Sequence, residues 1–222
     1  TAVATITGPT VTRSRDVPVS VTGESVFSVD GYYLSENSTP PSADASGWVG
    51  APPTTFKVSP GDGPKTVYGY VRDPEDFVSP AATLRIVLDT ASPSASIVLP
   101  RFSRSDSVDV RISALDAHGI GAYYLSSLNL PPQPDVKGWT VARPKTFRLP
   151  GKDGVKRVFM WVKDRAGNVS KTASDTTLQY GSNCQRKVPI TCAVAGRAAT
   201  SPAITARRHT TRRIRIRTPR SD

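Results

Sequence analysis

The chain repeats itself at a spacing of 91 residues. When residues 1–89 are aligned with residues 92–180 without a gap, 29 of the 89 pairs are identical. Unrelated stretches of ordinary composition agree at roughly 6% of positions, or about five pairs. The repeated unit is too long for a solenoid repeat and has the size of a small independent domain. The sequence therefore predicts two tandem domains, residues 1–89 and 92–180, followed by a distinct segment, residues 181–222.

Each repeat contains short stretches that alternate between apolar and polar residues. The clearest example is residues 17–21, where every second residue is valine, and its copy at 108–112. A period of two is typical of a strand with one buried face. Further strands are expected at 2–7, 29–35, 54–58, 67–72 and 82–88, and in the second repeat at 120–126, 145–149, 158–163 and 173–180. This spacing predicts an all-β protein made of two tandem Ig-like antiparallel β-sandwiches.

Turn residues connect these strands. Asp164–Asn168, with a glycine, is typical of a hairpin turn, and we expect a return strand to begin at Val169. The first repeat has Pro74–Phe77 at the corresponding place and lacks the glycine, so we expect another turn geometry there. Pro18 has no N–H to donate, which predicts a sheet edge or a strand start. The linker at 88–93 is short and contains a proline, so the two domains should lie roughly end to end.

The repeated motifs resemble a known class. In the second repeat they are Tyr-Tyr-Leu-Ser at 123–126, a proline-bearing loop to Gly-Trp at 138–139, Thr-Phe at 146–147, and Lys-x-Val-aromatic-x-aromatic-Val-Lys-Asp-x-Ala-Gly-Asn-Val-Ser at 156–170. This pattern, over about residues 1–180, resembles the bacterial immunoglobulin-like (fibronectin-III-like sandwich) tandem repeats of secreted and surface-attached proteins. The resemblance implies an extracellular or cell-surface location, a spacing, adhesive or scaffolding role, and no catalytic residues.

The leading hypothesis is therefore a non-catalytic structural or adhesive spacer or scaffold segment of a secreted or surface protein. Its partners would be a protein or a surface polysaccharide, or further copies of itself joined through sheet edges. The alternative is a carbohydrate-binding accessory module of a polysaccharide-degrading enzyme, with sugars stacked on Trp48, Trp139 and Trp161. Because Trp48 and Trp139 recur at equivalent positions, packing within each domain is the simpler role for them.

Residues for catalysis or metal binding are sparse. A serine hydrolase needs a histidine base, but the only histidines are His118, expected in a loop, and His209 near the C-terminus. Clustered Cys and His ligands for zinc are absent from the sequence. The aspartates fall at predicted turns, where their side chains cap backbone amides. We expect no enzyme activity and no cofactor. Calcium is kept as an alternative at the domain junction, where Asp89 could join oxygen ligands from neighbouring loops.

The last segment carries most of the net charge of +11. It is arginine-rich and poor in apolar residues, which predicts a basic, disordered tail. Such a tail either binds polyanions non-specifically or has no specific role. The candidate anion-binding residues are Arg207, Arg208, Arg212, Arg213, Arg215, Arg217 and Arg220.

The chain has two cysteines, Cys184 and Cys192, both beyond the repeats. A disulfide between them would close a short loop and stabilise it by about 2.5 kcal/mol in the chain-entropy model. The alternative is a pair of free thiols. No apolar run approaches the roughly 18 residues of a membrane-spanning helix. Because the sequence opens at Thr1 without a Met, we expect a processed product or a piece of a longer protein.

Overall fold

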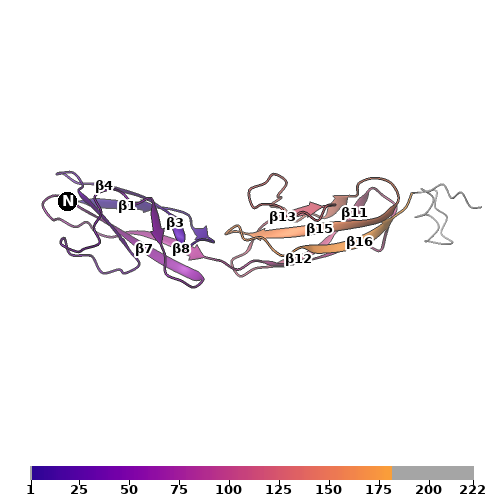
Figure 1. The fold of residues 1–222 in the computed structure, drawn as a ribbon, viewed down its shortest axis with the longest axis horizontal. Coiled ribbons are helices and arrows are strands. Elements are labelled where there is room, and N and C mark those ends of the chain that lie inside the picture. The colour runs from indigo at the N-terminus through magenta and orange to yellow at the C-terminus, as the bar shows by residue number, and fades with distance from the viewer. Residues whose placement is uncertain (1, 182–222) are drawn as a thin grey trace, which may run out of the picture.

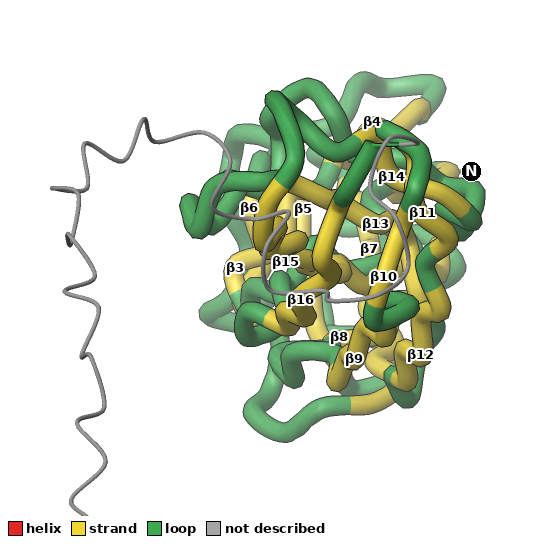
Figure 2. Tube along the Cα trace, turned by 90° about the vertical axis from the view of Figure 1, so that its right-hand side faces the viewer, coloured by secondary structure: helices red, strands yellow, loops and turns green. Residues whose placement is uncertain are grey.

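The computed structural model describes residues 2–181, which form two β-sandwiches placed end to end along the long axis (Figure 1). Viewed along that axis, this part of the chain consists of strands and loops without a helix (Figure 2). The predicted all-β class and the two tandem sandwiches are confirmed. Strands β1 to β8 lie in the first repeat and β9 to β16 in the second. The boundaries 1–89, 92–180 and 181–222 stay a prediction.

In the first repeat, one layer is a four-stranded sheet in the order β2–β8–β7–β5. The pairs β1–β4 and β3–β6 form the opposite layer, since β3 and β4 follow each other along one extended segment. Strand β2 runs parallel to β8, and the other pairs are antiparallel. The strand bounds are β1 Val3–Thr7, β2 Val11–Thr12, β3 Asp16–Pro18, β4 Ser20–Glu24, β5 Gly31–Ser35, β6 Thr55–Lys57, β7 Gly63–Arg72 and β8 Ala82–Leu88.

The second repeat has the same topology. Its four-stranded sheet runs β10–β16–β15–β13, opposite the pairs β9–β12 and β11–β14. Register is also kept: Val17 lies opposite Phe56 in the first repeat, and Val108 lies opposite Phe147 in the second. The bounds are β9 Ser94–Val98, β10 Phe102–Ser103, β11 Ser107–Asp109, β12 Arg111–Leu115, β13 Ile120–Ser126, β14 Thr146–Arg148, β15 Gly154–Asp164 and β16 Ala173–Gln179.

Pro18 lies in an edge strand, as predicted, because β3 pairs with β6 alone among the described strands. It is the last residue of β3, where the extended segment changes its partner from β6 to β1. The amide of Val19 donates to the Thr54 carbonyl at the break. The second repeat breaks at the equivalent Val110, although Asp109 stands in place of the proline. The break therefore results from the change of partner strand and not from the proline, which is merely compatible with it.

Each sandwich has its own hydrophobic core. The alternating valines of the first repeat point into it, with Val17 fully buried and Val19 and Val21 almost so. Burial of one such side chain contributes about 1.5–3 kcal/mol. The first core consists of Ile6, Val17, Val19, Val21, Val58, Val67, Leu84, Ile86 and Leu88. The second consists of Ile97, Leu99, Val108, Val110, Ile112, Tyr123, Leu149, Val158, Met160 and Val162.

The turn of the first repeat differs only in part from the glycine-containing turn: it shares two hydrogen bonds with it and adds a bond from the Asp76 amide to the Asp73 carbonyl. In the second repeat the Asp164 amide donates to the Asn168 carbonyl, and the Asn168 amide donates to the Asp164 carboxylate. The first repeat makes the same two bonds between Asp73 and Phe77. An aspartate can thus build the turn without a glycine. Val169 forms only an isolated bridge with Lys163, so the return strand β16 begins later than expected.

The first repeat keeps its turns at the cost of backbone strain. Ser28 and Asp76 adopt positive φ angles of 87° and 60°. The equivalent residues 91 positions later are Gly119 and Gly167, whose φ angles are 94° and 91°. A side chain in this region costs roughly 1 kcal/mol or more, whereas glycine tolerates it.

We therefore expect Ser28→Gly and Asp76→Gly each to stabilise the first repeat by about 0.5–1 kcal/mol, because the strain is relieved and the greater flexibility of glycine in the unfolded chain offsets part of the gain. Urea denaturation would measure the change in unfolding free energy. The reciprocal variants Gly119→Ser and Gly167→Asp are the matched controls and should destabilise the second repeat. A loss of stability in both glycine variants would contradict the assignment of strain.

Candidate functional site

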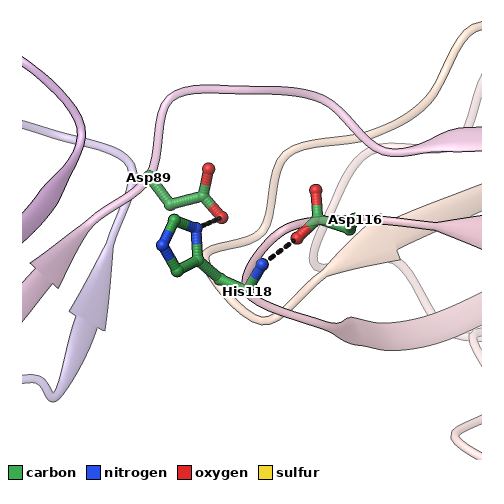
Figure 3. Close-up of side chains that lie close together, drawn as sticks. All are labelled: Asp89, Asp116 and His118. Atoms are coloured by element: carbon green, nitrogen blue, oxygen red, sulfur yellow. Dashed lines mark hydrogen bonds and ion pairs between the residues drawn. The ribbon is translucent and has the colours of Figure 1, made fainter.

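The junction between the sandwiches is built around Asp89, the residue directly after β8. Its side chain is buried, with 1% of the residue exposed, and its amide donates to the Thr12 carbonyl of its own repeat. The carboxylate also accepts a bond from the Ala91 amide, which folds the linker back on itself. The remaining oxygen, Oδ2, points to His118 of the next repeat, with 3.0 Å between Oδ2 and Nδ1 (Figure 3).

Two loops of the second repeat form the surface that contacts the linker: residues 116–119, between β12 and β13, and residues 164–168, at the end of β15. Asn168 donates from Nδ2 to the Asp89 carbonyl at 2.8 Å. Arg13 of the first repeat donates to the Gly167 carbonyl at 3.0 Å. The linker is thus bonded to both loops, and the Arg13 bond ties the body of the first repeat to the second.

Asp89, Asp116 and His118 could together hold a metal ion. One ligand atom from each lies within 4.8 Å of the others. The Asp89 Oδ2 and His118 Nδ1 atoms are buried, and in the described part of the chain each has no partner other than the other atom of this pair. Two ligands about 2.1 Å from a tetrahedral ion lie about 3.4 Å apart, so the pair at 3.0 Å would have to open slightly to hold one. Two carboxylates and an imidazole suit a first-row transition ion, whereas calcium prefers six to eight oxygens.

Zn²⁺ is therefore expected to raise the melting temperature of the protein, and Ca²⁺ at the same concentration is not. At a free ion concentration of 100 times the dissociation constant, the gain in stability is about 2.7 kcal/mol. Differential scanning calorimetry with each ion would measure it. His118→Ala should abolish the Zn²⁺ effect, whereas His209→Ala, the control at the other histidine, should retain it. Stabilisation by Ca²⁺ alone would support the calcium hypothesis instead of a transition-metal site.

The aspartates at the turns act as caps, as the sequence suggests. Asp164 accepts bonds from the amide and the side-chain Nδ2 of Asn168 and so fixes the side chain that reaches Asp89. Asp73 accepts bonds from the Ser25 hydroxyl and from the amides of Glu75 and Phe77. Burial would raise the pKa of Asp73, but these hydrogen bonds together outweigh it, so the pKa is lowered from its usual 3.8.

A carboxylate with a lowered folded-state pKa contributes stability above its unfolded-state pKa and loses it as the pH falls through the folded-state value. The first repeat should therefore lose stability as the pH falls below about 3.8, the usual pKa of Asp73. Asp73→Asn should flatten this part of the pH profile, because an amide oxygen still accepts the backbone bonds but does not titrate. Urea denaturation at several pH values would show it. An unchanged profile would refute a role for Asp73.

Trp161 is not available as a carbohydrate platform. It is 1% exposed and its Nε1 donates to the Thr172 hydroxyl. It lies on the opposite face of β15 from Met160, which belongs to the core between the sheets. The equivalent residue of the first repeat, Tyr70, is also fully buried, and its hydroxyl donates to the Ser38 carbonyl in the loop between β5 and β6. Burial raises the pKa of Tyr70.

Trp48 and Trp139 are half-buried and fasten that same loop in each repeat. Trp48 Nε1 donates to the Ser42 carbonyl, and its ring lies 5.5 Å from that of Tyr33 and 5.3 Å from the Arg72 guanidinium. Trp139 makes the equivalent contacts with Gln133, Tyr124 and Lys163. These aromatic side chains pack the loop onto the outer face of the four-stranded sheet, in agreement with the simpler role expected from their recurrence.

The remaining predicted sites fall outside the described residues. These are the cysteine pair Cys184 and Cys192 and the arginines of the tail. Within residues 2–181, the structure contains no helix that is long and apolar enough to cross a membrane. Sequence reasoning identified Asp89 at the junction but missed His118, Asp116 and Asn168 as its neighbours. The signal that could have revealed them is their position in the two loops at the linker end of the second repeat.

Comparison with known proteins finds structural neighbours only. No protein-family model matches the chain, and no curated protein matches it. The fibronectin(III)-like modules of Clostridium thermocellum CbhA are 14% identical, with a TM-score of 0.49, and the match covers 84% of this chain and 98% of that one. The D00–D0 domain of intimin is 8% identical, with a TM-score of 0.33, covering 80% of this chain and 99% of that one.

The BSP domain of a biofilm-associated protein is 15% identical, with a TM-score of 0.26, and the match covers 82% of this chain and 30% of that one.

Proposed function

We propose that this chain is a non-catalytic spacer or scaffold segment of a secreted or cell-surface bacterial protein, in which two sandwiches are held at a fixed angle. The observation that carries the proposal is the buried Asp89, which is bonded to its own repeat and contacts two loops of the next. A linker that only tethered two domains would have no need to bury a carboxylate, because an unpaired buried charge is costly. A rigid junction fixes the distance and orientation between the two sandwiches, which is what a spacer requires.

The rigidity of the junction tests the proposal. Spin labels on exposed strands of the two repeats would give a distance distribution by electron resonance, and we expect a narrow one. Asp89→Ala combined with Asn168→Ala should broaden it, because two of the three side-chain contacts described across the junction are removed and the Arg13 bond alone remains. Asp62→Ala is the matched control: Asp62 accepts a bond from Thr90 of the linker, and none of the hydrogen bonds described across the junction involves it. A broad distribution in the wild-type protein would refute a rigid spacer.

A carbohydrate-binding accessory module is the alternative, and Trp48 and Trp139 are the remaining rings for it. Tyr33 and Arg72 already contact the Trp48 ring, which leaves less of it for a sugar. Retention on insoluble glycans that is lost in the double variant Trp48→Ala, Trp139→Ala would favour this function over the spacer. For the arginine tail, loss of heparin retention on deletion of residues 207–220 would favour anion binding.

A further inference from the structure

We propose that copies of this chain associate head to tail, with the outer end of the second sandwich seated on the outer end of the first sandwich of another copy. The acceptor end, residues 25–28 and 73–77, corresponds at the 91-residue spacing to the two loops that receive the linker in the internal junction. The donor end, residues 101–104 and 180–181, corresponds to the part of the first repeat that contacts those loops. The internal junction therefore supplies the geometry of the contact.

At the two outer ends, aromatic residues occupy the positions that correspond to the polar contact residues of the internal junction. His118 and Asn168 correspond to Phe27 and Phe77 of the acceptor end, which are 58% and 61% exposed. Asp89, which touches both of them, corresponds to Tyr180 of the donor end. Buried in a junction of the same geometry, Tyr180 would pack against both phenylalanines. Exposed aromatic residues of this kind are typical of interaction sites.

Phe102 enlarges the aromatic surface of the donor end. It is 44% exposed and packs edge to face on Tyr180, with 6.2 Å between the ring centres. The two rings therefore already form one surface on the free protein. The acceptor end adds Val26, which is 81% exposed. Each outer end thus has exposed apolar side chains beside the residues that would meet in a contact with the geometry of the internal junction.

The charges of the two ends are complementary as well. Arg13, which donates to the Gly167 carbonyl in the internal junction, corresponds to the exposed Arg104 of the donor end. Gly167 corresponds to Asp76, an exposed carboxylate on the acceptor end. An arginine would therefore meet a carboxylate where the internal junction has a single backbone contact. Glu75 beside Asp76, and Arg101 beside Phe102, extend the opposite charges of the two ends.

This combination identifies the occupant as a second copy of the chain. The two surfaces that match lie at opposite ends of one molecule, so the contact is heterologous and continues into a linear filament. The ends of slender sandwiches are small, and interfaces below about 1,200 Å² are typical of weak complexes. We expect a dissociation constant on the order of 100 µM.

Sedimentation velocity and small-angle scattering of the full chain over a concentration series test the proposal. The length of the wild-type particles should increase with protein concentration in steps of one molecular length. Arg104→Glu and the pair Phe27→Ser, Phe77→Asn should each weaken association about tenfold or more, while the exposed controls Arg111→Glu and Val141→Ser should not. The double variant Arg104→Glu, Asp76→Lys should regain association relative to Arg104→Glu alone, because the charges are exchanged.

Three outcomes would overturn the proposal. The first is a chain that keeps the length of one molecule at all concentrations. The second is association that weakens in Asp76→Gly but not in Arg104→Glu, which would point to the arginine tail as the occupant of the acceptor end. The third is growth that is unchanged in all of these variants. All substituted side chains are exposed or half-exposed, so melting temperatures near the wild-type value would show that the variants fold.

Discussion

Replacing Trp161 by alanine is expected to destabilise the second sandwich by about 3–5 kcal/mol, a large part of the 5–15 kcal/mol of a typical domain. The indole is 1% exposed, packs against Tyr124 and Phe159, and donates to Thr172. Its loss leaves a cavity between the outer face of the sheet and the loop that covers it. Because each repeat has a separate core, the first sandwich should keep its own transition.

Calorimetry would therefore show two transitions in Trp161→Ala, the lower one from the second repeat, as hydrogen exchange would verify. Tyr70→Ala is the matched variant and should lower the transition of the first repeat instead. Trp139→Ala removes a half-buried ring and should cost less. A single transition that shifts as a whole would contradict the independence of the two cores.

The second large effect is expected for Asp164→Ala, which should destabilise the second repeat by about 2 kcal/mol and also loosen the junction. The buried carboxylate accepts bonds from the amide and from Nδ2 of Asn168, and that Nδ2 also donates to the Asp89 carbonyl. Alanine leaves these donors without their partner, which costs about 1–3 kcal/mol for a buried group. The side chain of Asn168 is then free to leave Asp89.

Urea denaturation and the spin-label distance distribution would measure the two effects on the same variant. Asp73→Ala is the control, because it removes the equivalent cap from the first repeat, far from the junction. It should destabilise that repeat without broadening the distance distribution. If Asp164→Ala left the distance distribution unchanged, Asn168 would hold the junction without its hydrogen bonds to Asp164.

Much of the fold follows from local patterns. The valines at 17–21 and their copy at 108–112 are buried as the alternation predicts, and the repeat motifs place the tyrosine strands correctly. Local patterns predict the turn of the first repeat less well, because Asp76 adopts a positive φ angle at a position where glycine is expected. Hydrogen bonds to Asp73 stabilise the turn enough to tolerate the strain, and that balance is not visible in a motif.

The candidate site was less predictable than the fold. Met160 and Trp161 are adjacent and both buried, but they face opposite sides of β15, and only the covering loop explains why both are inside. A rule that alternates buried and exposed residues assigns one of them to solvent. Asp89 was expected at the junction on sequence grounds, whereas His118 and Asn168 were not, since the loops that carry them are far from it in sequence.

By itself, the sequence determined the duplicated unit, the sandwich class and the position of the linker, because these depend on periodicity and turn chemistry within each repeat. Only the tertiary structure decided which side chains the two repeats bring together: Asp89 against His118 and Asn168 inside, and aromatic and charged residues at the two outer ends. The reason is that contacts between domains depend on where loops lie in space, and the identity of those loop residues has no period to reveal it.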